Sequence, residues 1–255
     1  NPVTGVWQPI KYTGTYGTNG FYLNFSDNSN NTATTIGKDY SGNGNNWTPN
    51  NISVTSGVTY DSMTDVPTLT SATAANYATL NPLQVTAASI GTVSDGNLSW
   101  SCGVSATYGK IYGTMAIPST GKYYWEVNVG STTGLEIGII SVSDQSANYP
   151  GYSSKGYTYC IDGTKGNNNV YTSYGATYTT GDVIGVAFDA DAGTLVFYKN
   201  NTSQGTAFSS LTATYVATLG NAFNSTSASA KINFGQQPFV YSLPSGYVAL
   251  NTYNL

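Results

Sequence analysis

The chain has 255 residues, enough for one large all-β domain or for a domain with an extension. Its 8 basic residues are all lysine, its 12 acidic residues give a net charge of −4, and arginine and histidine do not occur. This composition excludes the basic surface that binds nucleic acid and the arginine forks that bind phosphate, so we expect no nucleic-acid partner. No run approaches the about 18 apolar residues of a membrane span, so we expect no membrane partner. With 40% hydrophobic residues, the chain can still bury a substantial core.

Residues 1–75 are rich in Asn, Gly and Ser and contain short aromatic stretches. Two of these stretches favour strands: residues 20–27, with Phe21, Leu23 and Phe25 on one face, and residues 45–57. The aromatic segment 7–17 is expected to be an extended arm that pairs with a neighbouring subunit's sheet edge. We therefore expect an N-terminal extension over 1–75 and a β-sandwich over 76–255. Because the chain starts at Asn1 without methionine, we expect a processed chain or a piece of a longer one.

Alternation of apolar and polar residues predicts a series of strands after residue 75. Residues 94–101 and 110–118 come first, followed by 121–129, in which Tyr123, Trp125 and Val127 share a face. Residues 135–143 are expected to be the hairpin partner of 121–129. Further strands are expected at 156–163 and 230–235. The absence of a helical period predicts almost no helix.

The strongest local pattern is the run 181–201, GDVIGVAFDADAGTLVFYKNN. Ile184, Val186 and Phe188 form a bulky face of its first half, and residues 194–199 return as a second β-branched and aromatic strand. Between them, residues 190–193 have the composition of a tight turn, with Gly193 available for positive φ. The run predicts an antiparallel hairpin.

The motifs GKYYWEV, IGI, YTYCIDG, GDVIGVAFD and GTLVFYKN occur here in the order typical of a SPRY domain, and residues 80–250 resemble that family. The resemblance implies an all-β fold, an antiparallel β-sandwich of the concanavalin-like jelly-roll kind. It also implies that Glu126 is a framework residue and that partners dock on loops at one end of the sandwich. The matching loops would be 144–156, 163–169 and 200–207.

Residues 17–68 resemble a segment found before SPRY domains in structural proteins of tailed phages, especially those from aquatic samples. Within this segment, the run from Asp39 to Asn45, DYSGNGN, is also similar to the opening of laminin-G-like jelly rolls. An alternative is that these Asn- and Gly-rich stretches are ordinary long surface loops.

The lack of histidine removes Ser-His-Asp and Cys-His catalysis and imidazole metal sites. Paired carboxylates remain, as glycosidases use them, and the candidates are Glu126, Glu136 and the pair Asp189 and Asp191. Because the two aspartates flank a turn, capping of nearby amides is the favoured interpretation of that pair. We therefore expect a non-enzymatic protein without a cofactor.

Oxygen-rich runs at 24–31 and 39–46 could form a weak Ca²⁺ site, but Asx-turns are the favoured interpretation and no metal site is predicted. Cys102 and Cys160 could form one disulfide, although two separate buried thiols are favoured.

A neutral surface of tyrosine and asparagine suits either a sugar or a protein partner. The predicted binding residues are Tyr152, Tyr157, Tyr171, Tyr174, Asn167, Asn168, Asn200 and Asn201.

The leading functional hypothesis is a virion structural protein of a tailed phage, a fibre, spike or capsid-decorating subunit on the particle surface. Its partners would be other virion subunits, further copies of itself in a homo-oligomer, and a host surface glycan or protein. Two alternatives share the fold: a secreted carbohydrate-binding module, and a subunit of an extracellular filament joined by strand exchange.

Overall fold

The computed structural model describes residues 12–57, 59–65, 71–83, 91–103, 108–130, 133–144, 148–222 and 227–255. Contacts divide the chain into two compact units, one of residues 1–55 with 60–62 and the other of residues 56–59 with 63–255. The boundary expected at residue 75 stays a prediction.

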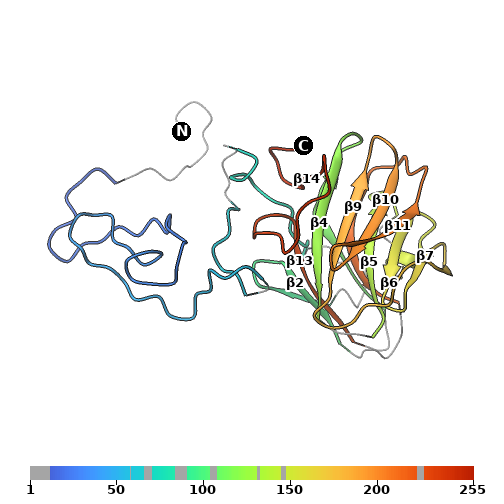
Figure 1. Ribbon diagram of the computed structural model, residues 1–255, viewed down its shortest axis with the longest axis horizontal. Coiled ribbons are helices and arrows are strands. Elements are labelled where there is room, and N and C mark those ends of the chain that lie inside the picture. The colour runs from blue at the N-terminus through green and yellow to red at the C-terminus, as the bar shows by residue number, and fades with distance from the viewer. Residues whose placement is uncertain are drawn as a thin grey trace. The chain divides into compact units, whose positions relative to one another are not determined.

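The larger unit is an antiparallel sandwich of two sheets (Figure 1). The 8-stranded sheet runs in the order β1 (Thr92–Ser94), β2 (Ser99–Cys102), β13 (Ala228–Asn233), β4 (Lys122–Val129), β9 (Val183–Asp189), β10 (Thr194–Lys199) and β11 (Thr202–Phe208), with the short β14 (Val248–Ala249) parallel to β4. The 6-stranded sheet runs in the order β3 (Gly109–Ile117), β12 (Tyr215–Asn221), β5 (Leu135–Ser141), β6 (Gly156–Cys160), β7 (Thr164–Asn167) and β8 (Val170–Ser173). Among the described residues the single helical element is the 3-10 turn η1 (Pro150–Tyr152). The predicted all-β sandwich is confirmed.

The core lies between the two sheets, where the side chains of their inner faces meet. Along each strand, these inward residues alternate with outward ones. Trp125 and Val127 of β4 and Phe188 of β9 belong to this core. The predicted hairpin is confirmed, because Asp189 of β9 pairs with Thr194 of β10. Gly193 in the connecting turn has a φ of 60°, as the turn composition indicates.

Two strand predictions for the larger unit are wrong. Residues 135–143 were expected to pair with 121–129, but β5 pairs with β6 and β12 in the other sheet, whereas β4 pairs with β9 and β13. Residues 94–101 do not form one strand: β1 and β2 form a hairpin whose turn has positive φ at Asp95, Gly96 and Asn97. Asp, Gly and Asn tolerate that conformation, and the turn splits the run.

The smaller unit contains no strand among its described residues, so the strands expected at 20–27 and 45–57 are wrong. Within the first run only Leu23 forms an isolated bridge, with Asp39, while Phe25 has a φ of 54°. The positive φ interrupts an extended chain, and Phe21 and Phe25 remain exposed. The arm expected at 7–17 falls largely outside the described residues.

Asp39 organises the smaller unit. Its carboxylate accepts hydrogen bonds from the backbone N–H groups of Tyr22, Ser41 and Asn45 at 2.8–2.9 Å. Burial raises the pKa of this carboxyl, but these hydrogen bonds outweigh the effect and lower it to about 2. The side-chain amide of Asn45 in turn donates to the carbonyls of Thr18 and Gly20. The oxygen-rich run 39–46 thus forms turn-stabilising bonds.

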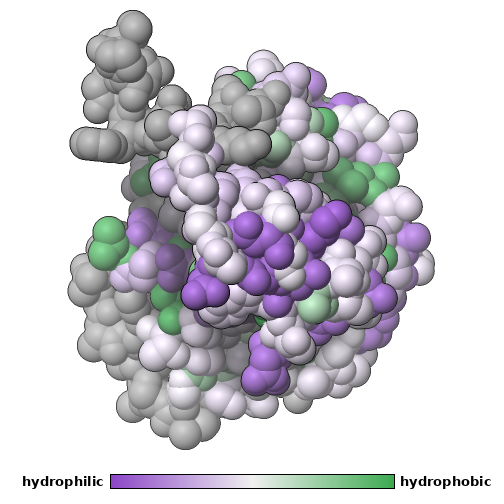
Figure 2. All heavy atoms as spheres, turned by 90° about the vertical axis from the view of Figure 1, so that its left-hand side faces the viewer, coloured by the Kyte–Doolittle hydropathy of each residue, from purple (hydrophilic) through white to green (hydrophobic). Residues whose placement is uncertain are grey.

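The surface in Figure 2 is largely polar, as expected from the many Asn, Ser and Thr residues of the chain. On the face in Figure 2, the coloured residues are mainly hydrophilic or of intermediate hydropathy, and the hydrophobic ones occur in small separate groups. In the described part of the chain, no helix has the length and apolar character to cross a membrane.

Candidate binding site

The segment that contains η1 covers the outward face of β5. Leu135 and Ile137 of β5 belong to the core, so Glu136 between them points away from it. Glu136 is nevertheless fully buried, and the Gly151 N–H in η1 donates to its Oε2 atom at 3.0 Å. The sheet therefore holds η1 through a buried carboxyl group.

Glu136 is also bound from two other strands. Its Oε1 atom accepts a hydrogen bond from the Tyr171 hydroxyl of β8 at 2.6 Å and a longer one from the Cys160 thiol of β6 at 3.7 Å. Burial raises the pKa of Glu136 to about 7, although the hydrogen bonds from Tyr171, Gly151 and Cys160 oppose the rise. One carboxyl thus connects η1 with three strands.

Two glycines allow Tyr171 to reach Glu136. A Cβ atom at Gly166 in β7 would lie 2.6 Å from Tyr171 Cε1, and one at Gly151 would lie 2.5 Å from Glu136 Oε1 and 2.7 Å from the Tyr171 hydroxyl. Distances this short do not occur between non-bonded atoms without displacement. A side chain at either position would push Tyr171 away from Glu136.

The turn between β7 and β8 packs against η1. Asn168 and Asn169 have φ values of 53° and 57°, the pair of positive angles that a type I′ hairpin turn requires. Their backbone N–H groups donate to the carbonyls of Ser153 and Gly151 at 2.9 Å. The Tyr149 hydroxyl donates to Asn169 Oδ1 at 2.7 Å.

Together these segments present an exposed surface, which we call the η1 surface: Tyr152, Asn168, Asn169 and Val170. Tyr152 is 46% exposed and Val170 is 58% exposed, and both asparagines are exposed as well. The Tyr152 ring packs edge-on against Tyr149, with ring centroids 5.5 Å apart. Exposed apolar groups therefore lie on a base that backbone hydrogen bonds hold in place.

A cavity of about 240 Å³ lies beside this surface. Glu136, Asp162, Tyr149 and Tyr171 line it together with Cys160, and the rest of its wall is mainly Gly, Ala, Leu, Ile and Thr. A mostly apolar pocket with a few convergent polar groups is a typical small-ligand or side-chain site.

The predicted binding residues divide into two groups. Tyr152, Asn167, Asn168 and Tyr171 gather around η1 and the turn between β7 and β8. The Asn167 amide donates to the carbonyls of Ser154 and Gly156 there. The structure does not bring the other four residues to this place, and a binding role for any of the eight stays a prediction.

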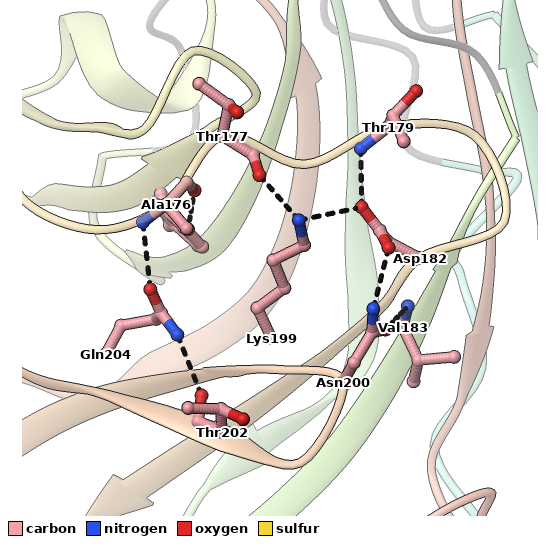
Figure 3. A network of polar contacts seen from close by, with 10 residues as sticks. Ala176, Thr177, Thr179, Asp182, Val183, Lys199, Asn200, Thr202 and Gln204 are labelled. Atoms are coloured by element: carbon pink, nitrogen blue, oxygen red, sulfur yellow. Dashed lines mark hydrogen bonds and ion pairs between the residues drawn. The ribbon is translucent and has the colours of Figure 1, made fainter.

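Asn200 and Asn201 form the turn between β10 and β11, again with positive φ at both positions. Figure 3 shows the Asn200 side chain tied to Asp182 and to the Val183 N–H, at 2.7 and 2.9 Å. In the same network, Lys199 connects Asp182 with the Thr177 carbonyl. This network fixes the segment before β9 to the β10–β11 hairpin.

Tyr157 and Tyr174 pack against the core. The Tyr157 ring contacts Phe208 and Tyr215, with centroids 5.1 and 5.9 Å away. The Tyr174 hydroxyl donates to the Gly205 carbonyl of β11 at 2.6 Å. Two segments expected as loops are largely strand: 163–169 contains all of β7 and 200–207 contains most of β11. Residues 145–147 of the third segment lie outside the described residues.

The carboxylates considered for catalysis are not paired. Glu126 lies on the outward face of the 8-stranded sheet and accepts hydrogen bonds from the backbone N–H groups of Val240 and Tyr241 at 2.7 and 3.0 Å. Glu136 belongs to the other sheet. Asp189 caps the Ala192 N–H and Asp191 caps that of Gly121. The capping interpretation of the two aspartates is confirmed.

Both cysteines are buried and free, as favoured. Cys102 belongs to the core between the sheets, whereas Cys160 lines the outward cavity. Among the described residues, no group of three or more His, Cys, Asp or Glu side chains is placed to hold a metal ion.

The sequence prediction missed the role of Glu136 as the anchor of η1. A signal was present, because a lone glutamate between Leu135 and Ile137 in a strand otherwise free of charge predicts a buried acid with dedicated donors. Its donors, Gly151 and Tyr171, are far away in the chain and carry no local sign of the contact.

Comparison with known proteins supports the predicted SPRY domain. The model of the SPRY domain matches residues 122–237. Ran-binding protein 10 of Danio rerio is 32% identical over 146 residues, which cover 52% of this chain and 23% of that protein. Human Ran-binding protein 9 is 31% identical over 146 residues, covering 52% of this chain and 19% of that protein. The chain thus spans about a fifth of these relatives.

Two solved structures resemble the sandwich. The SPRY domain of human HERC1 is 21% identical with a TM-score of 0.49, covering 55% of this chain and 90% of that one. Stonustoxin is 21% identical with a TM-score of 0.48, covering 62% of this chain and 27% of that one.

Proposed function

We propose that the chain is a non-enzymatic binding protein whose SPRY sandwich recognises another protein through the η1 surface. The observation that carries this proposal is the exposure of Tyr152 and Val170 on a base fixed by Glu136 and by the turn at Asn168 and Asn169. Rigid aromatic and apolar groups bind with little loss of conformational entropy. SPRY domains generally mediate protein interactions, and the relatives named above are called Ran-binding proteins.

The chemistry of the η1 surface favours a protein partner. Tyr152 and Val170 provide apolar contact, while the asparagine turn provides hydrogen-bond donors and acceptors at the rim. An apolar centre with a polar, weakly charged rim is typical of a protein interface. A nucleic acid would instead need a basic surface, which a chain with 8 lysines and no arginine lacks.

A displayed random-peptide library selected on the immobilised chain tests this proposal. We expect enriched peptides to lose at least about tenfold in affinity for the variants Tyr152→Ala and Val170→Asp, since buried hot-spot contacts are typically worth about 1.4 kcal/mol or more. Matched controls are Tyr253→Ala and Val248→Asp, which change exposed residues of the C-terminal segment. Equal loss in all four variants, or binding unaffected by the first two, would contradict the proposal.

We further propose that this binding protein is a structural subunit of a tailed-phage virion, exposed at the particle surface as a fibre, spike or decoration. The similarity of residues 17–68 to segments that precede SPRY domains in phage structural proteins supports this assignment, as do the few charges and the many Asn, Ser and Thr residues. Its partners would be other virion subunits, further copies of this chain, and a host surface protein or glycan.

Electron microscopy of purified native particles, labelled with antibodies against this chain, tests the virion role. We expect label on the tail or on the capsid, and no label after the antibodies are absorbed with purified chain. Mass spectrometry that finds the chain in the lysate but not in purified particles would refute the assignment.

A further inference from the structure

The cavity beside the η1 surface has a one-sided charge. Glu136 and Asp162 both line it, and none of its lining residues is a lysine. Because arginine and histidine do not occur in the chain, only a lysine could neutralise it. The neighbouring Lys165 points elsewhere, since its Nζ atom donates to the Ala207 carbonyl at 2.6 Å.

The two carboxyl groups are held differently. Glu136 is fully buried at the base of the cavity, where a low local polarity strengthens its field. Asp162 is exposed, and its Oδ1 atom accepts hydrogen bonds from the N–H and hydroxyl groups of Thr164 at 3.0 and 2.6 Å. Among the described residues, no donor contacts Asp162 Oδ2, so this atom is open to a ligand.

The remaining walls suit the stem of an amphipathic side chain. Tyr149 and Tyr171 provide aromatic surface, and Ile161 and Ala222 provide aliphatic surface. Aromatic faces attract cations, and methylene groups pack on aliphatic walls. The volume of about 240 Å³ lies just below the range of roughly 300–1,000 Å³ for pockets of drug-sized ligands, so the cavity fits a single side chain.

We propose that this cavity receives a cationic side chain, lysine or arginine, from the protein that docks on the η1 surface. The proposal rests on the proposed protein-binding function and specifies the partner's chemistry. The aliphatic stem of the incoming side chain packs against the cavity wall that Tyr149 and Tyr171 form. Its ammonium or guanidinium group contacts Asp162 Oδ2 and lies in the field of Glu136.

NMR titration of the isotope-labelled chain with capped single amino acids tests the cavity without any partner. The probes are Nα-acetyl-lysine N-methylamide, its arginine counterpart and, as a neutral control of similar length, the norleucine counterpart. We expect saturable shifts of the Thr164 and Ala222 methyl signals, with the better cationic probe binding at least fivefold more tightly than norleucine. Equal affinity of the three probes, or shifts that do not saturate, would overturn the proposal.

Charge-neutralising variants locate the effect. At about pH 8, above the pKa of about 7 of Glu136, Asp162→Asn and Glu136→Gln should each weaken the cationic probe by about fivefold, because each then removes one negative charge from the cavity. Asp162→Asn should leave the binding of norleucine unchanged. Asp191→Asn, an exposed residue of the β9–β10 turn that does not line the cavity, is the matched control and should retain full binding. If Glu136→Gln alters the fold, as judged from its NMR spectrum, Asp162→Asn alone decides the outcome.

Failure of this inference can be told apart from failure of the proposed function. Peptides that bind the η1 surface but show no enrichment of lysine or arginine, and that bind Asp162→Asn normally, would refute the cationic anchor and leave the binding function intact. Peptides whose affinity does not change in Tyr152→Ala would refute the proposed function, whether or not the capped amino acids bind in the cavity.

Discussion

Glu136 should make the stability of the sandwich depend on pH in an unusual direction. Burial raises its pKa to about 7 in the folded chain, against an ordinary value of 4.5. The folded state therefore prefers the protonated carboxyl. A group of this kind contributes its full stability below about pH 4.5, and this contribution is lost as the pH rises through about 7.

The two pKa values give the size of the effect. Since one pKa unit corresponds to about 1.4 kcal/mol, ionising Glu136 in the folded state costs on the order of 3 kcal/mol in a group that is fully buried. The chain contains no histidine, so no imidazole adds its own transition between pH 5 and 8. Glu126, whose pKa is also raised by burial, is the other carboxyl that can add to the pH dependence in the same direction.

Urea denaturation at half-unit steps from pH 5 to pH 8.5, followed by the fluorescence of the buried Trp100 and Trp125, measures this effect. We expect the wild-type free energy of unfolding to fall across the window. In Glu136→Gln most of that slope should vanish, because the amide does not ionise. Asp191→Asn, at an exposed turn, should keep the wild-type slope.

A slope that survives in Glu136→Gln would refute the reasoning, because the pH dependence would then come from another group. A wild-type stability that rises between pH 6 and pH 8 would refute it more directly, since the sign would be wrong. Uniform destabilisation of Glu136→Gln at every pH, with the slope gone, would agree with the argument and would measure the hydrogen bonds lost.

Three further predictions concern other parts of the chain. Gly166→Ala should cost about 1–3 kcal/mol in urea denaturation, because its Cβ would lie 2.6 Å from Tyr171 Cε1; a neutral result would mean that Tyr171 is not held across β7. The smaller unit should lose stability as the pH falls from about 4 through about 2, because the hydrogen bonds that lower the pKa of Asp39 stabilise the fold only while its carboxyl is ionised. The fluorescence of Trp47 should report this loss, and the variant Asp39→Asn should lack the transition. Melting at about 0.05 M and about 1 M NaCl should nearly coincide, because the chain has few charges and partly exposed ion pairs such as Lys122 with Asp189 contribute little. A shift of tens of degrees would contradict this.

Local patterns predicted the strands of the sandwich better than their partners. The hairpin of β9 and β10 was predictable because its turn and both alternating faces lie within one short run. The partner of β5 was not, since consecutive strands in a sandwich can belong to opposite sheets. The alternation of Leu135 and Ile137 specifies an inward face but not which sheet carries it.

The candidate site shows the same limit. The sequence placed Tyr152, Asn168 and Tyr171 near one another in the chain, and the structure gathers them around η1. It could not separate Asn200, whose side chain is used within its own turn, from Asn168, whose backbone binds η1. Residue type alone does not distinguish an asparagine that shapes a turn from one that is free to bind a partner.

The only two glutamates of the chain clarify how a protein with so few charges holds its surface segments. Glu126 and Glu136 point outward from different sheets, yet both are fully buried beneath a covering segment. Each accepts hydrogen bonds from backbone N–H groups of the segment that covers it. Burying a carboxylate is costly unless donors meet it, so each covering segment must keep its position for the charge to be tolerated. It follows that a partner on the η1 surface should be sensitive to Glu136→Gln, which acts beneath η1, but not to Glu126→Gln, which acts beneath residues 240–241 of the other sheet.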